Sequence, residues 1–154
     1  MQQVKPASVS LVSPVTLHSG SDLNNLIDLN VATNLQVEVL TSDPVTFWWT
    51  IDLGQAVKIT KIILQDWTET PGPGFDTGFS LRYSDSPLSA SNLGTVYGAA
   101  SFDSTAYPAT QDTTQTGDVT ARYWGLCRAG IFLNNGLICT EMEFYTDDFA
   151  GGIV

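Results

Sequence analysis

Hydrophobic and polar residues alternate in several segments of the chain, with the two-residue period of a β-strand. Residues 47–53 place Phe, Trp, Ile and Leu at every second position, which predicts a strand with one buried face. Gly54 and Gln55 then interrupt the alternation and predict the end of that strand.

A second strand is predicted over residues 57–64, because β-branched residues dominate this segment. Its inward positions change from Val57 and Ile59 to Ile62 and Leu64. Such a change of parity predicts a β-bulge near Lys61. Three further strands are predicted over residues 79–84, 122–127 and 137–145.

The segments between these strands carry turn-forming residues. No window shows a sustained 3.6-residue apolar period, although a short helical turn is predicted near residues 24–31. Prolines and glycines predict a loop at 70–74, and a polar composition predicts a long loop at 101–118. Many short strands separated by turns indicate an all-β sandwich or jelly roll.

The size and charge of the chain narrow the class of protein. It has 154 residues, of which 43% are hydrophobic and 14% charged, so we expect one folded domain. Its core is expected over about residues 16–146, with irregular tails at both ends. Six basic residues against sixteen acidic ones give a net charge of −10. Binding of nucleic acid or of anionic lipid needs clustered Lys and Arg, so the charge argues against both, and lipid recognition is only a third, weaker interpretation.

The sequence shows no apolar run typical of a membrane span or a signal peptide. No stretch approaches the ~20 apolar residues of a membrane span, and residues 1–6 lack the apolar run of a secretory signal. We therefore expect no signal peptide and no membrane insertion. The chain is expected at a cell surface or in a virion through a larger assembly, and otherwise in the cytoplasm.

The few cysteine and histidine residues limit metal and catalytic chemistry. Cys127 and Cys139 are predicted to be reduced, buried thiols, with a disulfide between them as the alternative. The single histidine, His18, is assigned to a surface loop. This leaves no usual zinc site, and no catalytic triad other than one built on His18. Glycosidases use a pair of carboxylates, but nearly any loop of an acidic protein offers such a pair. A carboxylate pair therefore does not indicate catalysis here, and we expect that the protein is not an enzyme.

Four segments together resemble a discoidin domain, also called the coagulation factor five/eight C-type domain. They are residues 25–33, residues 48–54, residues 79–85, and the closing strands around 121–126 and 140–145. This galactose-binding-like group includes many carbohydrate-binding modules, and the resemblance covers residues 24–145. It implies an eight-stranded antiparallel jelly-roll sandwich.

An oxygen-rich loop at residues 28–33 is the best candidate for a metal site. Asp28, Asn30 and Thr33 offer the oxygen ligands that calcium prefers. The resemblance implies a structural calcium held by the ligand set Asn25 (carbonyl), Asp28, Asn30 (carbonyl), Thr33, Thr140 (carbonyl) and Glu141. Leu29 departs from the family pattern, which often has glycine there, and such a position strains a leucine if φ is positive. A turn capped by Asp28 without metal is the alternative.

Sugar binding needs aromatic faces and a few polar groups. The candidates are Trp67, Glu69, Phe75, Asp76 and Tyr107. The alternative for Trp67 is a tryptophan that covers the end of the core, and the alternative for Tyr107 is an anchor of a long loop.

Other large and charged side chains on the predicted strands are assigned to structure. Trp48, Trp49 and Trp124 are assigned to packing, and Arg82 and Arg122 to pairing with nearby acids.

Two functions are consistent with these features. The first is a non-catalytic module that binds a surface glycan, with calcium stabilising a loop. The second is a structural virion component, such as a phage capsid decoration or tail protein, that attaches to neighbouring protein subunits.

Overall fold

The computed structural model describes residues 1–39, 46–70, 77–103, 111–128 and 135–148. Within these ranges η1 (Leu23–Leu26), a single 3-10 turn, is the one helical element, where a short turn was predicted. The strands are β1 (Gln2–Val4), β2 (Ser8–Leu11), β3 (Thr16–Leu17), β4 (Leu35–Val39), β5 (Phe47–Thr70), β6 (Thr77–Ser84), β7 (Thr95–Asp103), β8 (Gln111–Arg128), β9 (Asn135–Cys139) and β10 (Glu141–Thr146). All their pairings are antiparallel, which confirms the predicted all-β class. No helix in the described ranges has the length and apolar character that crossing a membrane requires.

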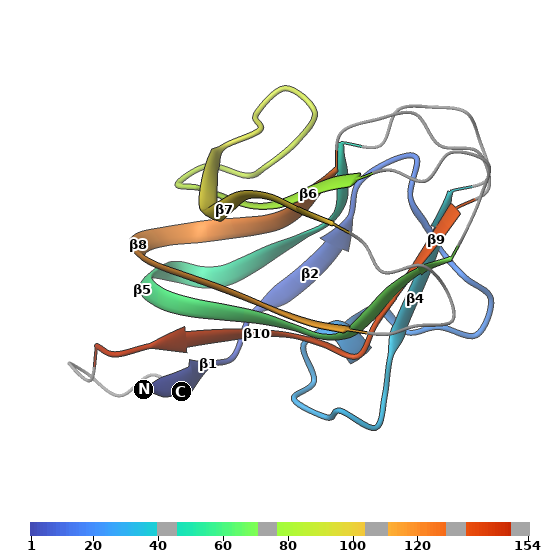
Figure 1. Ribbon diagram of the computed structural model, residues 1–154, viewed down its shortest axis with the longest axis horizontal. Coiled ribbons are helices and arrows are strands. Elements are labelled where there is room, and N and C mark those ends of the chain that lie inside the picture. The colour runs from blue at the N-terminus through green and yellow to red at the C-terminus, as the bar shows by residue number, and fades with distance from the viewer. Residues whose placement is uncertain (40–45, 71–76, 104–110, 129–134, 149–154) are drawn as a thin grey trace.

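The strands form a jelly-roll sandwich of two sheets that share β5 (Figure 1). One sheet has the order β1-β10-β5-β8-β6-β7, and β2 pairs with the first part of β5. The other sheet contains β3, β4, β9 and the last residues of β5. The 24-residue β5 therefore connects the two layers.

Bulges allow β5 to curve. Its pairing with β8 shifts between Asp52 and Val57, around Gly54, whose φ of 83° suits a glycine. The strand end predicted at Gly54 is therefore wrong, because the strand continues through a bulge. The bulge predicted near Lys61 is confirmed by a shift of register between Ile59 and Lys61.

Another bulge carries β5 from one sheet to the other. The register shifts between Leu64 and Trp67, and Asp66 adopts a φ of 45°. The backbone N–H of Asp66 donates to Asp112 Oδ1 at 2.8 Å, and from Thr68 onward β5 pairs with β9. Trp67 thus lies inside a strand.

Two other predicted segments have different boundaries. Residues 111–118 of the predicted long loop belong to β8, and residues 101–103 belong to β7. The single strand predicted over 137–145 is divided at Thr140 into β9 and β10.

The N-terminal segment is part of the sandwich. Gln2 pairs with Thr146 in β10, and Ser8 pairs with Asp52 in β5. The irregular N-terminal tail that the sequence predicted is therefore wrong over β1 and β2. Residues 149–154 of the predicted C-terminal tail lie outside the described residues.

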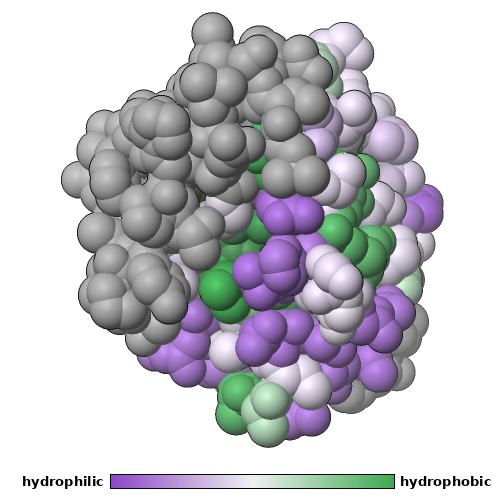
Figure 2. Space-filling model, turned by 90° about the vertical axis from the view of Figure 1, so that its right-hand side faces the viewer, coloured by the Kyte–Doolittle hydropathy of each residue, from purple (hydrophilic) through white to green (hydrophobic). Residues whose placement is uncertain are grey.

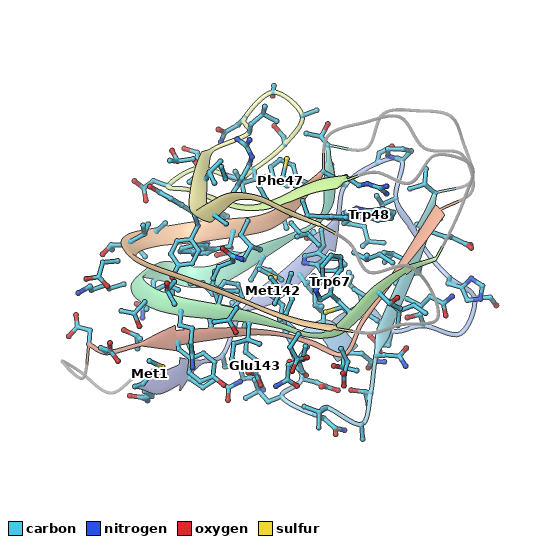
Figure 3. All side chains as sticks on the ribbon, viewed as in Figure 1. Met1, Phe47, Trp48, Trp67, Met142 and Glu143 are labelled. Carbon is cyan, nitrogen blue, oxygen red and sulfur yellow. The ribbon has the colours of Figure 1, made fainter. Side chains whose placement is uncertain are left out.

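The core lies between the two sheets and is rich in aromatic residues. Trp48, Trp49, Trp67 and Trp124 are all fully buried, as predicted for the three other than Trp67. Figure 3 shows Trp67 and Met142 in the interior of the sandwich. Trp124 makes edge-to-face contacts with Tyr97 and Phe144, at ring distances of 5.0 and 5.8 Å. Such pairs add stability beyond the area that they bury.

Phe47 does not share the inward face predicted for it. The register of β5 with β8 shifts between Phe47 and Trp49, so Trp48 and Trp49 both enter the main core. Phe47 instead packs with Leu88 and Cys127 in a second, smaller cluster. Both cysteines are free and buried, as predicted, and no disulfide joins them.

The described surface carries few large hydrophobic side chains. The exposed ones are Met1, Leu17, Leu29, Val31 and Leu93, of which only Leu29 and Val31 share one loop. Figure 2 shows hydrophobic residues in small groups among hydrophilic ones on one side of the molecule. Isolated apolar residues of this kind are ordinary for a soluble surface.

Candidate functional site

The loop that follows η1 is shaped by its own polar side chains. Asp22 caps η1 by accepting a hydrogen bond from the Asn24 N–H at 2.9 Å. The buried side chains of Leu26 and Ile27 then fix the end of the turn in the core. This anchoring brings residues 28–33 to the start of β10.

Asp28 organises the loop as an Asx turn. Its Oδ1 accepts from the Asn30 N–H at 2.9 Å, and its Oδ2 accepts from the Thr33 hydroxyl at 2.8 Å. The Thr33 hydroxyl also lies 2.8 Å from the Asn30 carbonyl oxygen. Asp28, Asn30 and Thr33 are thus brought together as the sequence predicted.

Glu141 reaches the same loop from β10. Its Oε1 accepts from the Asn30 N–H at 2.9 Å, so two carboxyl groups share one backbone donor. Glu141 is fully buried, and its Oε2 has no hydrogen-bond partner within the described part of the chain. A buried carboxylate oxygen without a partner is costly, and a bound cation would compensate it.

The two carboxyl groups have opposite pKa shifts. Burial raises the pKa of Glu141 to about 8, and the neighbouring Asp28 carboxyl adds to this rise. Burial alone would raise the pKa of Asp28, but its contacts with Glu141, Thr33 and Asn30 outweigh burial and lower it. At neutral pH the Glu141 carboxyl therefore keeps its proton, while the Asp28 carboxyl is ionised.

Asn25 and Thr140, two further members of the predicted ligand set, make hydrogen bonds through groups other than the carbonyl oxygens predicted to bind calcium. The side-chain amide of Asn25 donates to the Asn34 carbonyl at 2.8 Å. Thr140 donates through both its N–H and its hydroxyl to the Gln65 carbonyl, at 3.1 and 2.9 Å. The carbonyl roles of Asn25, Asn30 and Thr140 stay predictions. The described residues contain no cluster of three or more His, Cys, Asp or Glu side chains suited to a metal. A calcium ion here would therefore combine two carboxylates with neutral oxygens.

Leu29 occupies the position at which the resemblance led us to expect glycine. Its φ is 62°, and 45% of its surface is exposed. A side chain with a Cβ is strained in this left-handed region by roughly 1–2 kcal/mol. The turn thus keeps the shape of a glycine turn despite the leucine.

We expect Leu29→Gly to stabilise the protein by about 0.5–1 kcal/mol. The substitution removes the strain, and the extra freedom of glycine in the unfolded chain, about 0.4–1 kcal/mol, offsets part of the gain. Urea unfolding measures this change. Val31→Gly, at an exposed position of the same loop without a positive φ, is the matched control and should destabilise. Equal destabilisation by both substitutions would contradict the expected strain at Leu29.

Of the residues predicted to bind sugar, the structure describes the side chain of Trp67 only. Trp67 is fully buried, packs edge-to-face on Phe79 at 5.1 Å, and donates from Nε1 to Thr113 Oγ1 at 2.7 Å. Its assignment as an exposed sugar platform is wrong, because none of its surface is accessible, and the core alternative holds. Glu69 lies in β5 opposite Leu137, and its side chain is outside the described set. Phe75, Asp76 and Tyr107 lie outside the described residues.

The sequence patterns missed a polar hollow beside the Asp28 loop. It has a volume of about 260 Å³ and is lined by Ser19, Ser21, Asn25, Thr33, Asn34 and Gln36, among others. Nearby, His18 Nδ1 lies 3.0 Å from Glu38 Oε2. No apolar run marks this hollow in the sequence, because polar loop residues build it.

The sequence did anticipate that Arg122 pairs with an acid. Its Nε and Nη2 donate to the two oxygens of Asp52, at 2.8 and 2.9 Å. This bidentate contact lowers the pKa of Asp52.

Solved structures with this fold cover nearly the whole chain. The CBM32 module of AlyQ in complex with 4,5-unsaturated mannuronic acid matches with a TM-score of 0.58 and 19% identity, over 94% of this chain and 98% of that one. The family 32 module of C. perfringens NanJ in complex with galactose matches with a TM-score of 0.56 and 17% identity, over the same shares of the two chains. The fold is that of the discoidin-like carbohydrate-binding modules.

A third structure agrees with this result. The lectin-binding domain of Lectinolysin, complexed with Lewis b, matches with a TM-score of 0.58 and 18% identity, over 95% of this chain and 97% of that one. No protein-family model and no curated protein sequence matches the chain. At these identities the comparisons establish the carbohydrate-binding-module fold, which confirms the predicted jelly roll.

Proposed function

We propose that this protein is a non-catalytic module that binds a glycan. The observation that carries the proposal is the match of its whole fold to separate modules solved with sugars bound. Fold alone does not determine function, so the proposal also draws on the chemistry of the described residues. The net charge of −10 disfavours polyanionic partners, and the described loops and sheet faces are rich in hydroxyl and amide groups.

We further propose that calcium is a structural cation of this module. The side chains of Asp28, Thr33 and Glu141 would hold it, with carbonyl oxygens of Asn25, Asn30 and Thr140. The partnerless Oε2 of buried Glu141 and the adjacent Asp28 carboxylate support this assignment. A bound calcium would supply positive charge that links the loop after η1 to β10, and folding energy by mass action.

The virion alternative loses one of its supports. It depended partly on irregular tails available for docking, and β1 and β2 are instead paired within the sandwich. The compared structures lend it no support. We therefore retain the glycan-binding function, with a partner at a cell surface or in an extracellular polymer.

A glycan array probed with the calcium-loaded protein tests the proposal. We expect saturable binding to a small set of related glycans, and the bound glycans should be recovered chemically unchanged. Circular dichroism on the same sample establishes that the protein is folded. A folded protein that binds no glycan above background would overturn the proposal, and cleavage of a bound glycan would overturn its non-catalytic part.

A further inference from the structure

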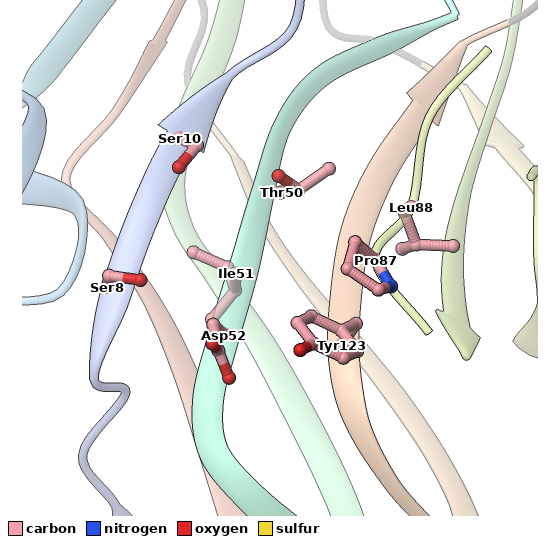
Figure 4. Close-up of a pocket in the computed structure, with 8 residues that line it drawn as sticks. All are labelled: Ser8, Ser10, Thr50, Ile51, Asp52, Pro87, Leu88 and Tyr123. Carbon is pink, nitrogen blue, oxygen red and sulfur yellow. The ribbon is translucent and has the colours of Figure 1, made fainter. Parts of the chain in front are cut away.

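A pocket opens on the outer face of the sheet that contains β2, β5 and β8 (Figure 4). We call it the sheet-face pocket, and it has a volume of about 160 Å³. Its lining consists of Ser8, Ser10, Thr50, Ile51, Asp52, Pro87, Leu88 and Tyr123. None of these residues belongs to the Asp28 loop or to the predicted sugar-binding set.

The lining divides into a polar part and an apolar part. Figure 4 shows the polar side chains of β2 and β5 on one side, and Pro87, Leu88 and Tyr123 together on the other. Ser8 faces Asp52 and Ser10 faces Thr50 across the pairing of these two strands. A surface with hydroxyls beside an aromatic and aliphatic wall matches the two-sided chemistry of a sugar ring.

The polar groups of the pocket have unused hydrogen-bonding capacity. Among the described residues, the hydroxyls of Ser8, Ser10, Thr50 and Tyr123 make no side-chain hydrogen bond to the protein. Ser8 and Ser10 are exposed. Each hydroxyl can both donate and accept, as the hydroxyls of a sugar can.

Asp52 is held in a fixed position at the edge of this group. Arg122 binds both of its oxygens, and the Gly54 N–H donates to Oδ1 at 2.7 Å. The ion pair uses two of the five N–H donors of the guanidinium group. Because the carboxylate charge is already neutralised by Arg122, the pocket favours a neutral ligand over a cation. The net charge of −10 disfavours an anion.

The apolar wall is also fixed before any ligand arrives. Leu88 packs with Phe47 and Cys127, and Tyr123 packs against this same cluster. The segment after β6 is closed by paired bonds between Ser89 and Asn92, and the Asn92 amide donates to the Pro87 carbonyl at 3.0 Å. A pocket formed in advance loses little conformational entropy on binding.

The size of the pocket sets the size of the ligand. A cavity of about 150 Å³ holds one six-membered ring, and the sheet-face pocket is of this size. We propose that the sheet-face pocket binds a single neutral sugar unit. Its hydroxyls would bond to Ser8, Ser10, Thr50 and Asp52, and its apolar face would lie against Tyr123, Pro87 and Leu88. This inference rests on the proposed glycan-binding function and locates one site for it.

NMR titration of ¹⁵N-labelled protein tests the location. The probes are methyl β-galactoside, methyl α-mannoside and methyl β-N-acetylglucosaminide, with methyl glucuronide as the anionic control. At least one neutral probe should shift the amide signals of residues 8–10, 50–52 and 123 in a saturable manner. The anionic control should bind at least tenfold more weakly.

The double variant Ser10→Ala/Thr50→Val tests the chemistry. It removes two hydroxyls without changing strand geometry, and we expect affinity for the neutral probe to fall about tenfold. Thr120→Val, at an exposed position of β8 outside the pocket, is the matched control and should bind normally. Thermal melting of each variant verifies that the fold is retained.

The outcomes separate this inference from the proposed function. If an array glycan binds but neither the sheet-face signals nor the double variant respond, the pocket assignment is overturned and the glycan-binding function stands. If neither the array glycans nor the three methyl glycosides bind, both are overturned. Binding of the glucuronide as tight as that of the neutral probes would overturn the neutral-ligand assignment.

Discussion

Excess calcium is expected to raise the melting temperature of the protein by roughly 5–10 °C over its value in EDTA. A ligand at about 100 times its dissociation constant adds ~2.7 kcal/mol, and each kcal/mol is worth about 2–4 °C for a domain of this size. The expected site is the pair formed by Asp28 and buried Glu141. Calorimetry of the wild type and of Asp28→Asn, with and without calcium, measures the effect.

Asp28→Asn should remove the rise, because it replaces one of the two carboxylates by an amide. Asp85→Asn changes an exposed acid outside the loop and should leave the rise unchanged. A rise that persists in Asp28→Asn would place calcium elsewhere. No rise in the wild type would contradict the proposed cation.

The pH dependence gives a second readout of the same site. Without calcium, Glu141 keeps its proton up to a pKa of about 8, whereas the ordinary pKa of a glutamate in the unfolded chain is 4.5. The folded state then binds more protons than the unfolded state, so calcium-free stability falls as pH rises from about 4.5 to about 8. Calcium competes with that proton, so its stabilising effect should grow over the same range. Glu141→Gln should flatten both trends.

Trp67→Ala is expected to destabilise the protein by about 3–5 kcal/mol and to leave sugar affinity unchanged. The tryptophan is fully buried, so its loss leaves a large cavity and ends the contact with Phe79. Urea unfolding, followed by titration with a bound glycan at low temperature, measures the two quantities separately. A stable variant that no longer binds glycan would restore Trp67 as a sugar platform.

Thr113→Val serves as the control for the hydrogen bond alone. It removes the acceptor of the Trp67 indole N–H but keeps the ring in place. We expect a loss of about 0.5–1.5 kcal/mol, the net contribution of one hydrogen bond. A loss as large as that of Trp67→Ala would mean that the bond, rather than packing, holds the ring.

Features of the fold could be predicted where the alternation of hydrophobic and polar residues along a single strand reveals them. The bulge near Lys61 was visible because the inward parity changes between Ile59 and Ile62 along the same segment. The place of Phe47 in the smaller cluster was not visible, because the register shift between Phe47 and Trp49 is defined by pairing with β8. The same reason applies to Trp67, since the turn at Asp66 depends on a bond from distant Asp112.

Strands with few apolar residues were also not predicted from the sequence. The first part of β8 carries Thr, Gln, Asp and Gly with few apolar residues, so hydrophobic alternation gave no sign of it. It pairs with β5 all the same, from Thr113 to Val119. The meeting of Asp28 with Glu141 came from the family resemblance, because no local pattern links residues so far apart in the chain.

The pairing of β1 with β10 has a consequence for the order in which the protein assembles. Gln2 and Thr146 are partners although nearly the whole chain lies between them, and the amino terminus lies 3.6 Å from Asp147. Closing so long a loop is the largest single entropic cost of any contact in the sandwich. Local hairpins such as β6–β7 can form first, and the two outermost strands are expected to join last. The first and last strands of the chain therefore complete the sheet only after the strands between them have paired.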